Sequence, residues 1–79
     1  MKEAKFYTKD FYCACVLRVM GFPLINIEKQ SMGFSNFVFD DKDHKAKLIV
    51  NRFWNRDLKV DARLFVESIN ELKTRLHTH

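Results

Sequence analysis

The segment Asp10–Phe22, with the sequence Asp-Phe-Tyr-Cys-Ala-Cys-Val-Leu-Arg-Val-Met-Gly-Phe, most constrains how this chain can fold. Asp10 is a favourable N-cap, because its carboxylate can accept a hydrogen bond from an unpaired amide of the first turn. Gly21 can adopt the left-handed conformation that ends a helix, and Pro23 prevents its continuation. Between these ends nearly every residue is apolar, and Arg18 is the single charged one. A helix that is apolar nearly all round is buried on several sides, so we expect the other elements to pack around it.

The apolar residues of this helix also predict which of its faces is buried. Four of them recur at the spacing of one helical face: Cys13, Val16, Leu17 and Met20. Cys13 and Cys15 point to different faces because they are two residues apart, so we expect no disulfide between them. Two cysteines without further ligands do not form a metal site. We interpret both as small buried hydrophobes.

Three segments have the composition and periodicity of β-strands. Lys5–Thr8 is rich in strand-forming residues and leads into the helix. Leu24–Glu28 alternates apolar and polar residues, and Phe34–Phe39 is the expected returning strand of a hairpin. The intervening Lys29–Gly33 supplies turn chemistry, with Gly33 at positive φ. The alternation places four side chains on matching faces of the hairpin: Ile25, Ile27, Phe37 and Phe39.

Two further helices are predicted in the second half of the chain. One runs from about His44 to Asn55, and the next begins after Asp61, which can cap it. The core stripe of the former comprises Ala46, Ile49, Val50 and Phe53. The core stripe of the latter comprises Ala62, Phe65, Val66, Ile69, Leu72 and Leu76. The outer face of that last helix carries charges spaced for i,i+4 pairing, the pattern of a solvated face: Arg63, Glu67, Glu71 and Arg75.

The resulting order is β-α-β-β-α-α, an α+β domain in which a small antiparallel hairpin sheet packs against three helices. We expect residues 1–79 to form a single domain, because a chain of 79 residues has no room for a second, with residues 77–79 frayed. The N-terminus lacks the apolar core of a signal peptide, and no apolar run approaches the roughly 20 residues that span a bilayer. We therefore expect a cytoplasmic protein without membrane association.

The sequence offers no recognisable catalytic constellation. It contains no glycine-rich phosphate loop and no serine in a nucleophile-elbow context. The one dense acidic cluster, Asp40, Asp41 and Asp43, falls at a strand-to-helix junction, where capping and dipole compensation explain it without a metal. His44 begins a helix and has no obvious Asp or Cys partner with which it could form a catalytic or metal site. We expect no enzymatic activity, no cofactor and no metal site.

Positive charge is concentrated in one part of the chain. Lys42–Arg63 carries seven basic and three acidic residues, so it accounts for the whole net charge of +4. Its basic residues could neutralise phosphates, and Trp54 could stack on a base. The candidate nucleic-acid-binding residues are Lys45, Lys47, Arg52, Trp54, Arg56, Lys59 and Arg63. The alternative interpretation is a charged helix face that serves solubility, with Trp54 partly buried.

No sequence signature indicates base-specific recognition. The second and third helices are joined by too long a segment for a helix-turn-helix, and Phe37–Phe39 lacks the aromatic signature of the RNA-binding sheet. Any contact with nucleic acid would therefore be to the backbone and non-specific.

Several of these local features together resemble a known family. They are Phe6-Tyr7-Thr8-Lys9-Asp10 at the helix start, Gly21-Phe22 at its end, Phe37-Val38-Phe39, Val60-Asp61, and Leu72-Lys73 in the last helix. In this arrangement the chain resembles, over about residues 5–73, a small uncharacterised domain family of bacterial and phage proteins. The resemblance implies a bacterial, archaeal or mobile-element source and a stand-alone small protein. It implies no activity and assigns no functional residues.

Two hypotheses from different classes follow. The first is a non-catalytic module that binds nucleic acid through Lys42–Arg63. The second is a protein-interaction module, a phage-type inhibitor, an accessory protein of a host partner or a homodimer, that uses the hairpin edge or an exposed aromatic patch. Exposure of Tyr12, Cys15 or Val19 would leave one side of the first helix uncovered and would favour the second hypothesis.

Overall fold

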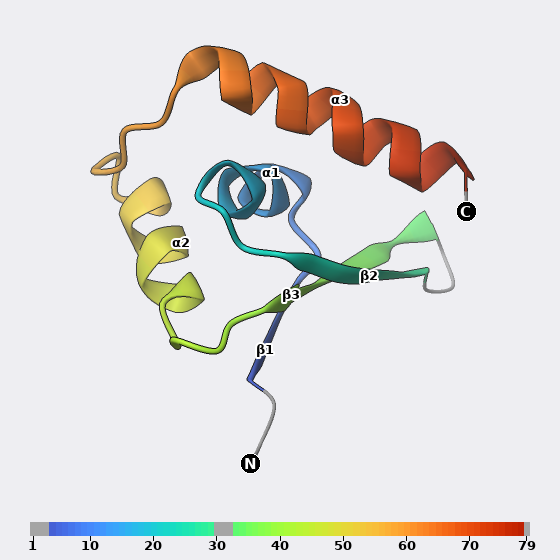
Figure 1. Ribbon diagram of the computed structural model, residues 1–79, viewed down its shortest axis with the longest axis horizontal. Helices are drawn as coiled ribbons and strands as arrows, with labels where there is room; N and C mark the ends of the chain where they lie inside the picture. The colour runs from blue at the N-terminus through green and yellow to red at the C-terminus, as the bar shows by residue number, and fades with distance from the viewer. Residues whose placement is uncertain (1–3, 30–32, 79) are drawn as a thin grey trace.

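The fold, seen in a computed structural model that describes residues 4–29 and 33–78, alternates short strands with helices. Within these residues the order of elements confirms the predicted α+β domain, and Figure 1 shows their arrangement. The elements are β1 (Lys5–Thr8), α1 (Phe11–Val19), β2 (Leu24–Lys29), β3 (Ser35–Asp40), α2 (Ala46–Trp54) and α3 (Ala62–Thr78). Most of the predicted hairpin turn, residues 30–32, lies outside the described residues. Gly33 has the expected positive φ, 81°.

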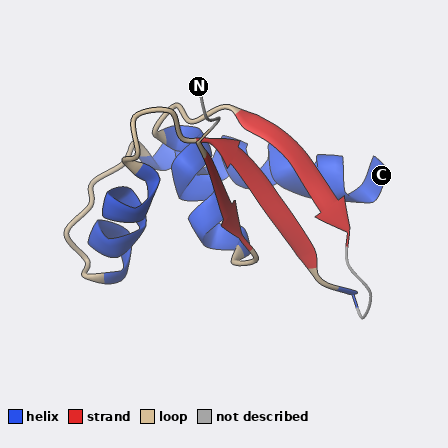
Figure 2. Ribbon diagram, turned by 90° about the horizontal axis from the view of Figure 1, so that it is seen from below, coloured by secondary structure: helices blue, strands red, loops and turns tan. Residues whose placement is uncertain are grey.

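The sheet is antiparallel, with β3 between β1 and β2, and Figure 2 shows α1 and α3 behind it. Phe37 and Phe39 of β3 are buried in the core, as predicted. Ile27 of β2 is buried too, but Ile25 is 50% exposed, so the prediction that the two isoleucines share the core face was wrong. The cause is a register shift between Leu24 and Asn26, because an inserted residue changes the face to which its side chain points.

Helix α1 occupies the centre of the domain, between α3 and the sheet in Figure 1, and contacts α2 on its side. Its ends are those predicted. The Asp10 carboxylate accepts a hydrogen bond from the Cys13 amide at 3.0 Å. Gly21 has φ 93°, and the Phe22 amide donates to the Leu17 carbonyl at 3.0 Å, which closes the last turn.

The burial of α1 follows the prediction except at its two edges. Residues 13–17 are buried, and both cysteines are free thiols. Met20 is 40% exposed, contrary to the prediction, because the helix ends at Val19 and Met20 is its C-cap. Tyr12 is 56% exposed, whereas Cys15 is fully buried and Val19 partly so. One side of the N-terminal half of α1 is therefore uncovered.

Helix α2 is shorter than predicted at its start. Lys45 provides no side-chain cap, and the buried carboxylate of Asp41 instead accepts hydrogen bonds from the amides of Lys45 and Ala46, at 2.9 and 3.0 Å. His44 adopts a left-handed conformation, φ 56°, that keeps it out of the helix. The capping role predicted for the acidic cluster is thus carried by Asp41. The predicted core stripe of α2 packs as expected, with Ala46 and Ile49 buried.

Helix α3 starts where predicted, since Asp61 accepts a hydrogen bond from the Leu64 amide at 2.9 Å. Phe65, Ile69, Leu72 and Leu76 pack on the core. Ala62 and Val66, however, are exposed, so their assignment to the core stripe was wrong. The buried side of α3 is centred on Ser68 and Leu72, and α3 touches α1 over a narrow strip, which leaves Val66 on its flank.

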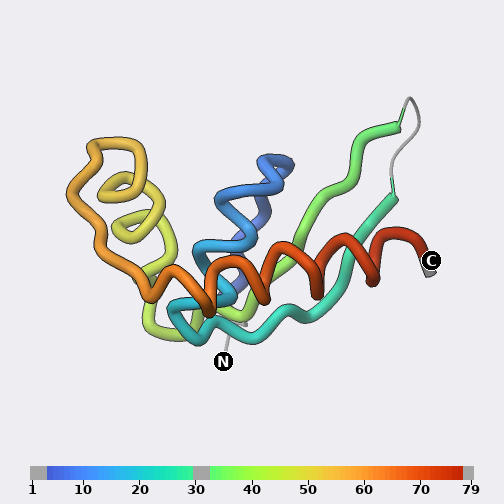
Figure 3. Tube along the Cα trace, turned by 90° about the horizontal axis from the view of Figure 1, so that it is seen from above, coloured from blue at the N-terminus to red at the C-terminus, as the bar shows by residue number. Residues whose placement is uncertain are grey.

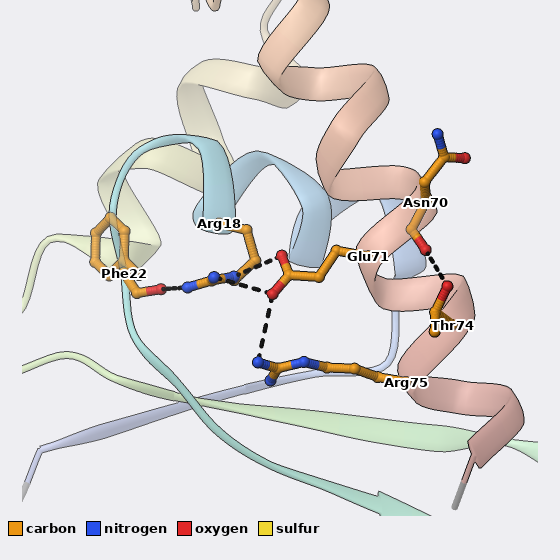
Figure 4. A network of polar contacts seen from close by, with 6 residues as sticks. All are labelled: Arg18, Phe22, Asn70, Glu71, Thr74 and Arg75. Carbon is orange, nitrogen blue, oxygen red and sulfur yellow. Dashed lines mark hydrogen bonds and ion pairs between the residues drawn. The ribbon is translucent and has the colours of Figure 1, made fainter.

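The predicted solvated face of α3 is only partly solvated. Arg63 and Glu67 form an exposed i,i+4 pair at 3.4 Å, as the spacing indicated. Glu71 instead turns to α1, where Arg18 donates to both of its carboxylate oxygens at 3.2 and 3.1 Å (Figure 4). Arg18 also donates to the Phe22 carbonyl, and Arg75 pairs with Glu71 at 3.4 Å. This network ties α3 to the end of α1.

Candidate nucleic-acid interface

Three of the predicted basic residues surround one hollow at the C-terminal end of α2. The hollow has a volume of about 330 Å³ and is lined by Arg52, Arg56, Lys59, Asp57, Met20 and Leu58. Arg52 belongs to the last turn of α2, and the other two cations follow in the connection to α3. The basic hollow, as we call this site, therefore has three cations against one carboxylate, over an apolar floor of Met20 and Leu58.

The chain reversal after α2 brings these cations together. Arg56 adopts a left-handed conformation, φ 60°, directly after the helix. Its amide donates to the Phe53 carbonyl at 3.1 Å, and the Asp57 amide donates to the Arg52 carbonyl at 2.9 Å. These two hydrogen bonds end the helix in the way that is usual when a glycine occupies the position of Arg56. An arginine in the left-handed conformation costs about 1–2 kcal/mol. Arg56 thus keeps a charged side chain at a strained position, a combination typical of functional sites.

Asp57 holds Arg52 at the edge of the basic hollow. The Arg52 guanidinium donates to the Asp57 carbonyl at 3.1 Å and lies 3.9 Å from its carboxylate. Both side chains are well exposed, 47% and 74%, so this ion pair is weak. An incoming phosphate can replace the carboxylate as the partner of Arg52, because a guanidinium binds either group in the same forked geometry.

A second hollow continues from the first along the same side of the domain. It has a volume of about 470 Å³ and shares Met20 with the basic hollow. Its charged residues are Lys42 and Lys45 together with Asp40, Asp41 and Asp43. The acids outnumber the bases here, so Lys45 does not extend a continuous positive surface from Arg52.

The remaining predicted residues lie elsewhere. Trp54 is two residues from Arg52, a rotation of about 200° around the helix, so it points to the opposite flank of α2. Lys47 is seven residues before Trp54 and shares that flank. Trp54 interacts there with the Cys13 thiol and remains 60% exposed. Arg63 is paired with Glu67 on α3. Trp54 is therefore not placed to stack on a base whose phosphate occupies the basic hollow.

Sequence reasoning missed the apolar floor of the site. Met20 was assigned to the core, yet it lines the basic hollow together with Leu58. Met20 could have been found from its position beside Gly21, because the residue next to a helix-ending glycine lies at the frayed edge of the helix. The position of Leu58 close to Met20 depends on the packing of α2 against α1.

The described part of the chain contains neither a cluster of metal ligands nor a membrane-spanning helix. No three His, Cys, Asp or Glu side chains among residues 4–29 and 33–78 gather closely enough to hold a metal ion. Within the same residues, no helix combines the length and apolar character needed to cross a membrane. Three of the seven predicted site residues, Arg52, Arg56 and Lys59, converge at the basic hollow.

Comparison with known proteins identifies a family and assigns no activity. Neither a curated protein nor a solved structure matches the sequence. A family model described as Domain of unknown function (DUF5659) matches residues 3–78, which agrees with the resemblance to an uncharacterised domain family. Since this match spans almost the whole chain, the protein belongs to the DUF5659 family.

Proposed function

We propose that this protein is a non-catalytic module that binds the phosphate backbone of nucleic acid, without sequence specificity, through the basic hollow. The observation that carries the proposal is the convergence of Arg52, Arg56 and Lys59 on one hollow that contains a single acid, Asp57. Phosphate contacts of this kind supply most of the affinity in non-specific binding. The free thiols of Cys13 and Cys15 fit an intracellular, reducing setting such as the cytoplasm.

The chemistry of the hollow suits a phosphate diester. Two guanidinium groups can each donate two hydrogen bonds to phosphate oxygens, and Lys59 adds a third positive charge. With about three phosphates neutralised, the affinity for a single strand should fall with a slope of about −2 in log K against log salt.

The test is the fluorescence anisotropy of a labelled oligonucleotide, titrated with protein at low and at physiological salt. The single variants Arg52→Glu and Lys59→Glu should each weaken binding at low salt by roughly tenfold, because a phosphate then meets negative charge. Arg63→Glu is the matched control, since it changes the charge of the same basic segment at an exposed site outside the hollow. It should weaken binding far less.

A second variant separates binding from folding. Arg56→Gly removes one cation and also relieves the left-handed strain, so it should raise stability in urea by roughly 0.5 kcal/mol while it weakens oligonucleotide binding. The proposal fails if the wild-type protein does not retain the oligonucleotide near 50 mM salt, a concentration at which non-specific binding is strong. Equal losses in Arg52→Glu and Arg63→Glu would also contradict it, since they would reflect net charge alone.

A further inference from the structure

The charges of the basic hollow suit one kind of phosphate group better than another. Its lining holds three cations, Arg52, Arg56 and Lys59, and one acid, Asp57, which together give a net charge of +2. A phosphodiester inside a strand has a single negative charge and two non-bridging oxygens. A phosphomonoester at the end of a strand has about two negative charges at neutral pH and three acceptor oxygens. The hollow therefore matches the monoester in charge, and it offers one cation for each of the three oxygens.

The pairing of Arg52 with Asp57 also favours a doubly charged ligand. The Arg52 guanidinium donates to the Asp57 carbonyl at 3.1 Å, and its Nε lies 3.9 Å from the Asp57 carboxylate. A ligand has to compete with this carboxylate for the guanidinium. A diester has the same charge as the carboxylate, whereas a monoester has about twice that charge. The monoester is therefore the stronger competitor.

The end of α2 does not oppose an anion with unpaired carbonyl groups. Carbonyls at the C-terminus of a helix normally give that end a partial negative charge. Here the Phe53 carbonyl accepts the Arg56 amide, and the Arg52 carbonyl accepts the Asp57 amide. The connection to α3, which carries Arg56 and Lys59, runs along the outer edge of the molecule (Figure 3). The end of a strand can therefore approach the hollow from solvent.

The surroundings of the hollow do not continue its positive charge. The second hollow, which shares Met20 with it, contains three acids and two lysines. Beyond Lys59, the carboxylate of Asp61 caps α3, and Arg63 is paired with Glu67. Proteins that bind the interior of a strand have a positive groove that follows its backbone. A positive surface confined to one hollow fits the end of a strand instead, where a single phosphate group carries the extra charge.

We propose that the preferred occupant of the basic hollow is the terminal phosphomonoester of a nucleic acid strand, and that internal phosphodiesters bind there more weakly. The inference rests on the function proposed above, because it names which phosphate of nucleic acid the same site prefers.

The test compares three oligonucleotides of about 6 nucleotides, a length within the site size of small binding modules. They share one sequence and an internal dye, and they carry no terminal phosphate, a 5′-phosphate or a 3′-phosphate. In anisotropy titrations, a phosphorylated strand should bind roughly tenfold tighter than the unphosphorylated one, because one more negative charge then lies beside three cations. A free nucleoside monophosphate should compete more weakly than the phosphorylated strand, since it lacks the neighbouring diester.

Variants are compared by the ratio of the two affinities, phosphorylated over unphosphorylated, which cancels any loss of folded protein. Arg56→Gly removes one of the three cations and should lower this ratio to roughly threefold or less. Arg63→Glu is the control for net charge, because Arg63 lies outside the hollow. It should weaken both strands equally and leave the ratio unchanged.

A second pair of variants tests whether the adjoining acids confine the positive surface. Asp43 is exposed and lines the second hollow, so Asp43→Lys extends the positive charge beyond the basic hollow. It should strengthen binding of the unphosphorylated strand and so lower the ratio by roughly twofold or more. Glu67→Lys makes the same change in charge on α3, outside both hollows, and should leave the ratio unchanged.

The outcomes separate this inference from the proposed function. Equal affinities for all three oligonucleotides near 50 mM salt, a concentration at which non-specific binding is strong, would overturn the inference and leave the proposed function standing. Absence of binding by all three would overturn both. A ratio that Arg56→Gly leaves unchanged would place the phosphate at another site. A nucleoside monophosphate that competes as well as the phosphorylated strand would assign the hollow to free nucleotides, and the inference would fail.

Discussion

Cys13 and Cys15 have buried thiols, with 2% and 0% of their residue surface exposed. Burial, and next the carboxylate of Asp10, raise the pKa of Cys13 to about 11, partly offset by Trp54. Burial likewise raises the pKa of Cys15 to about 11, although a hydrogen bond with Ser68 lowers it somewhat. Both side chains are therefore neutral core residues at physiological pH and unreactive as nucleophiles, as their interpretation as small hydrophobes requires.

The raised thiol pKa values predict a loss of stability at alkaline pH. In the unfolded chain the thiols ionise near pH 9, whereas in the folded chain they ionise near pH 11. Their contribution is complete below pH 9 and is lost as the pH rises toward 11. Thermal unfolding followed by circular dichroism should show this fall, and a Cys13→Ala/Cys15→Ala variant should show a smaller one. If the two proteins lose stability equally over this range, the thiols are not responsible.

At the scale of elements, α3 is held to α1 by both apolar packing and charge. The Arg18–Glu71 contact is bidentate, and the two side chains are only 28% and 33% exposed. Charge-assisted bidentate pairs with limited solvent access are stronger than ordinary surface pairs. The same guanidinium also bonds the Phe22 carbonyl, so one network both ends α1 and docks α3 (Figure 4).

Removing this carboxylate should be measurable in urea unfolding. Glu71→Gln should lower the free energy of unfolding by about 1 kcal/mol, because Arg18 and Arg75 lose their charged partner. Glu67→Gln is the same substitution one turn earlier on α3. Its partner Arg63 is 89% exposed, so the expected change is within about 0.5 kcal/mol. A cost at Glu67 equal to that at Glu71 would show that the docking of α3 does not depend on the network.

At the scale of the whole molecule, positive charge gathers at one end of α2. The basic hollow holds Arg52, Arg56 and Lys59 with one acid, whereas the hollow that shares Met20 with it contains more acids than bases. Trp54 is exposed on the other flank of α2. The positive surface is therefore confined to the C-terminal end of α2 and does not run along the domain.

Where the prediction from sequence succeeded, the determinants were local. The Asp10 cap and the Gly21 stop depend on residues within a few positions of each other, and the structure contains both. For Glu71, where it failed, the deciding contact was distant. Glu71 was assigned to a solvated face because its pairing with Arg18, 53 positions away, is not visible in helical spacing.

The sequence by itself determined the element order and most of the core, since periodicity and capping are properties of neighbouring residues. It also located the basic segment that contains Arg52, Arg56 and Lys59. Only the tertiary structure decided that these three cations and Met20 line one hollow. The physical reason is that α2 contacts α1 through one stripe, and the packing of that stripe sets which flank faces which neighbour.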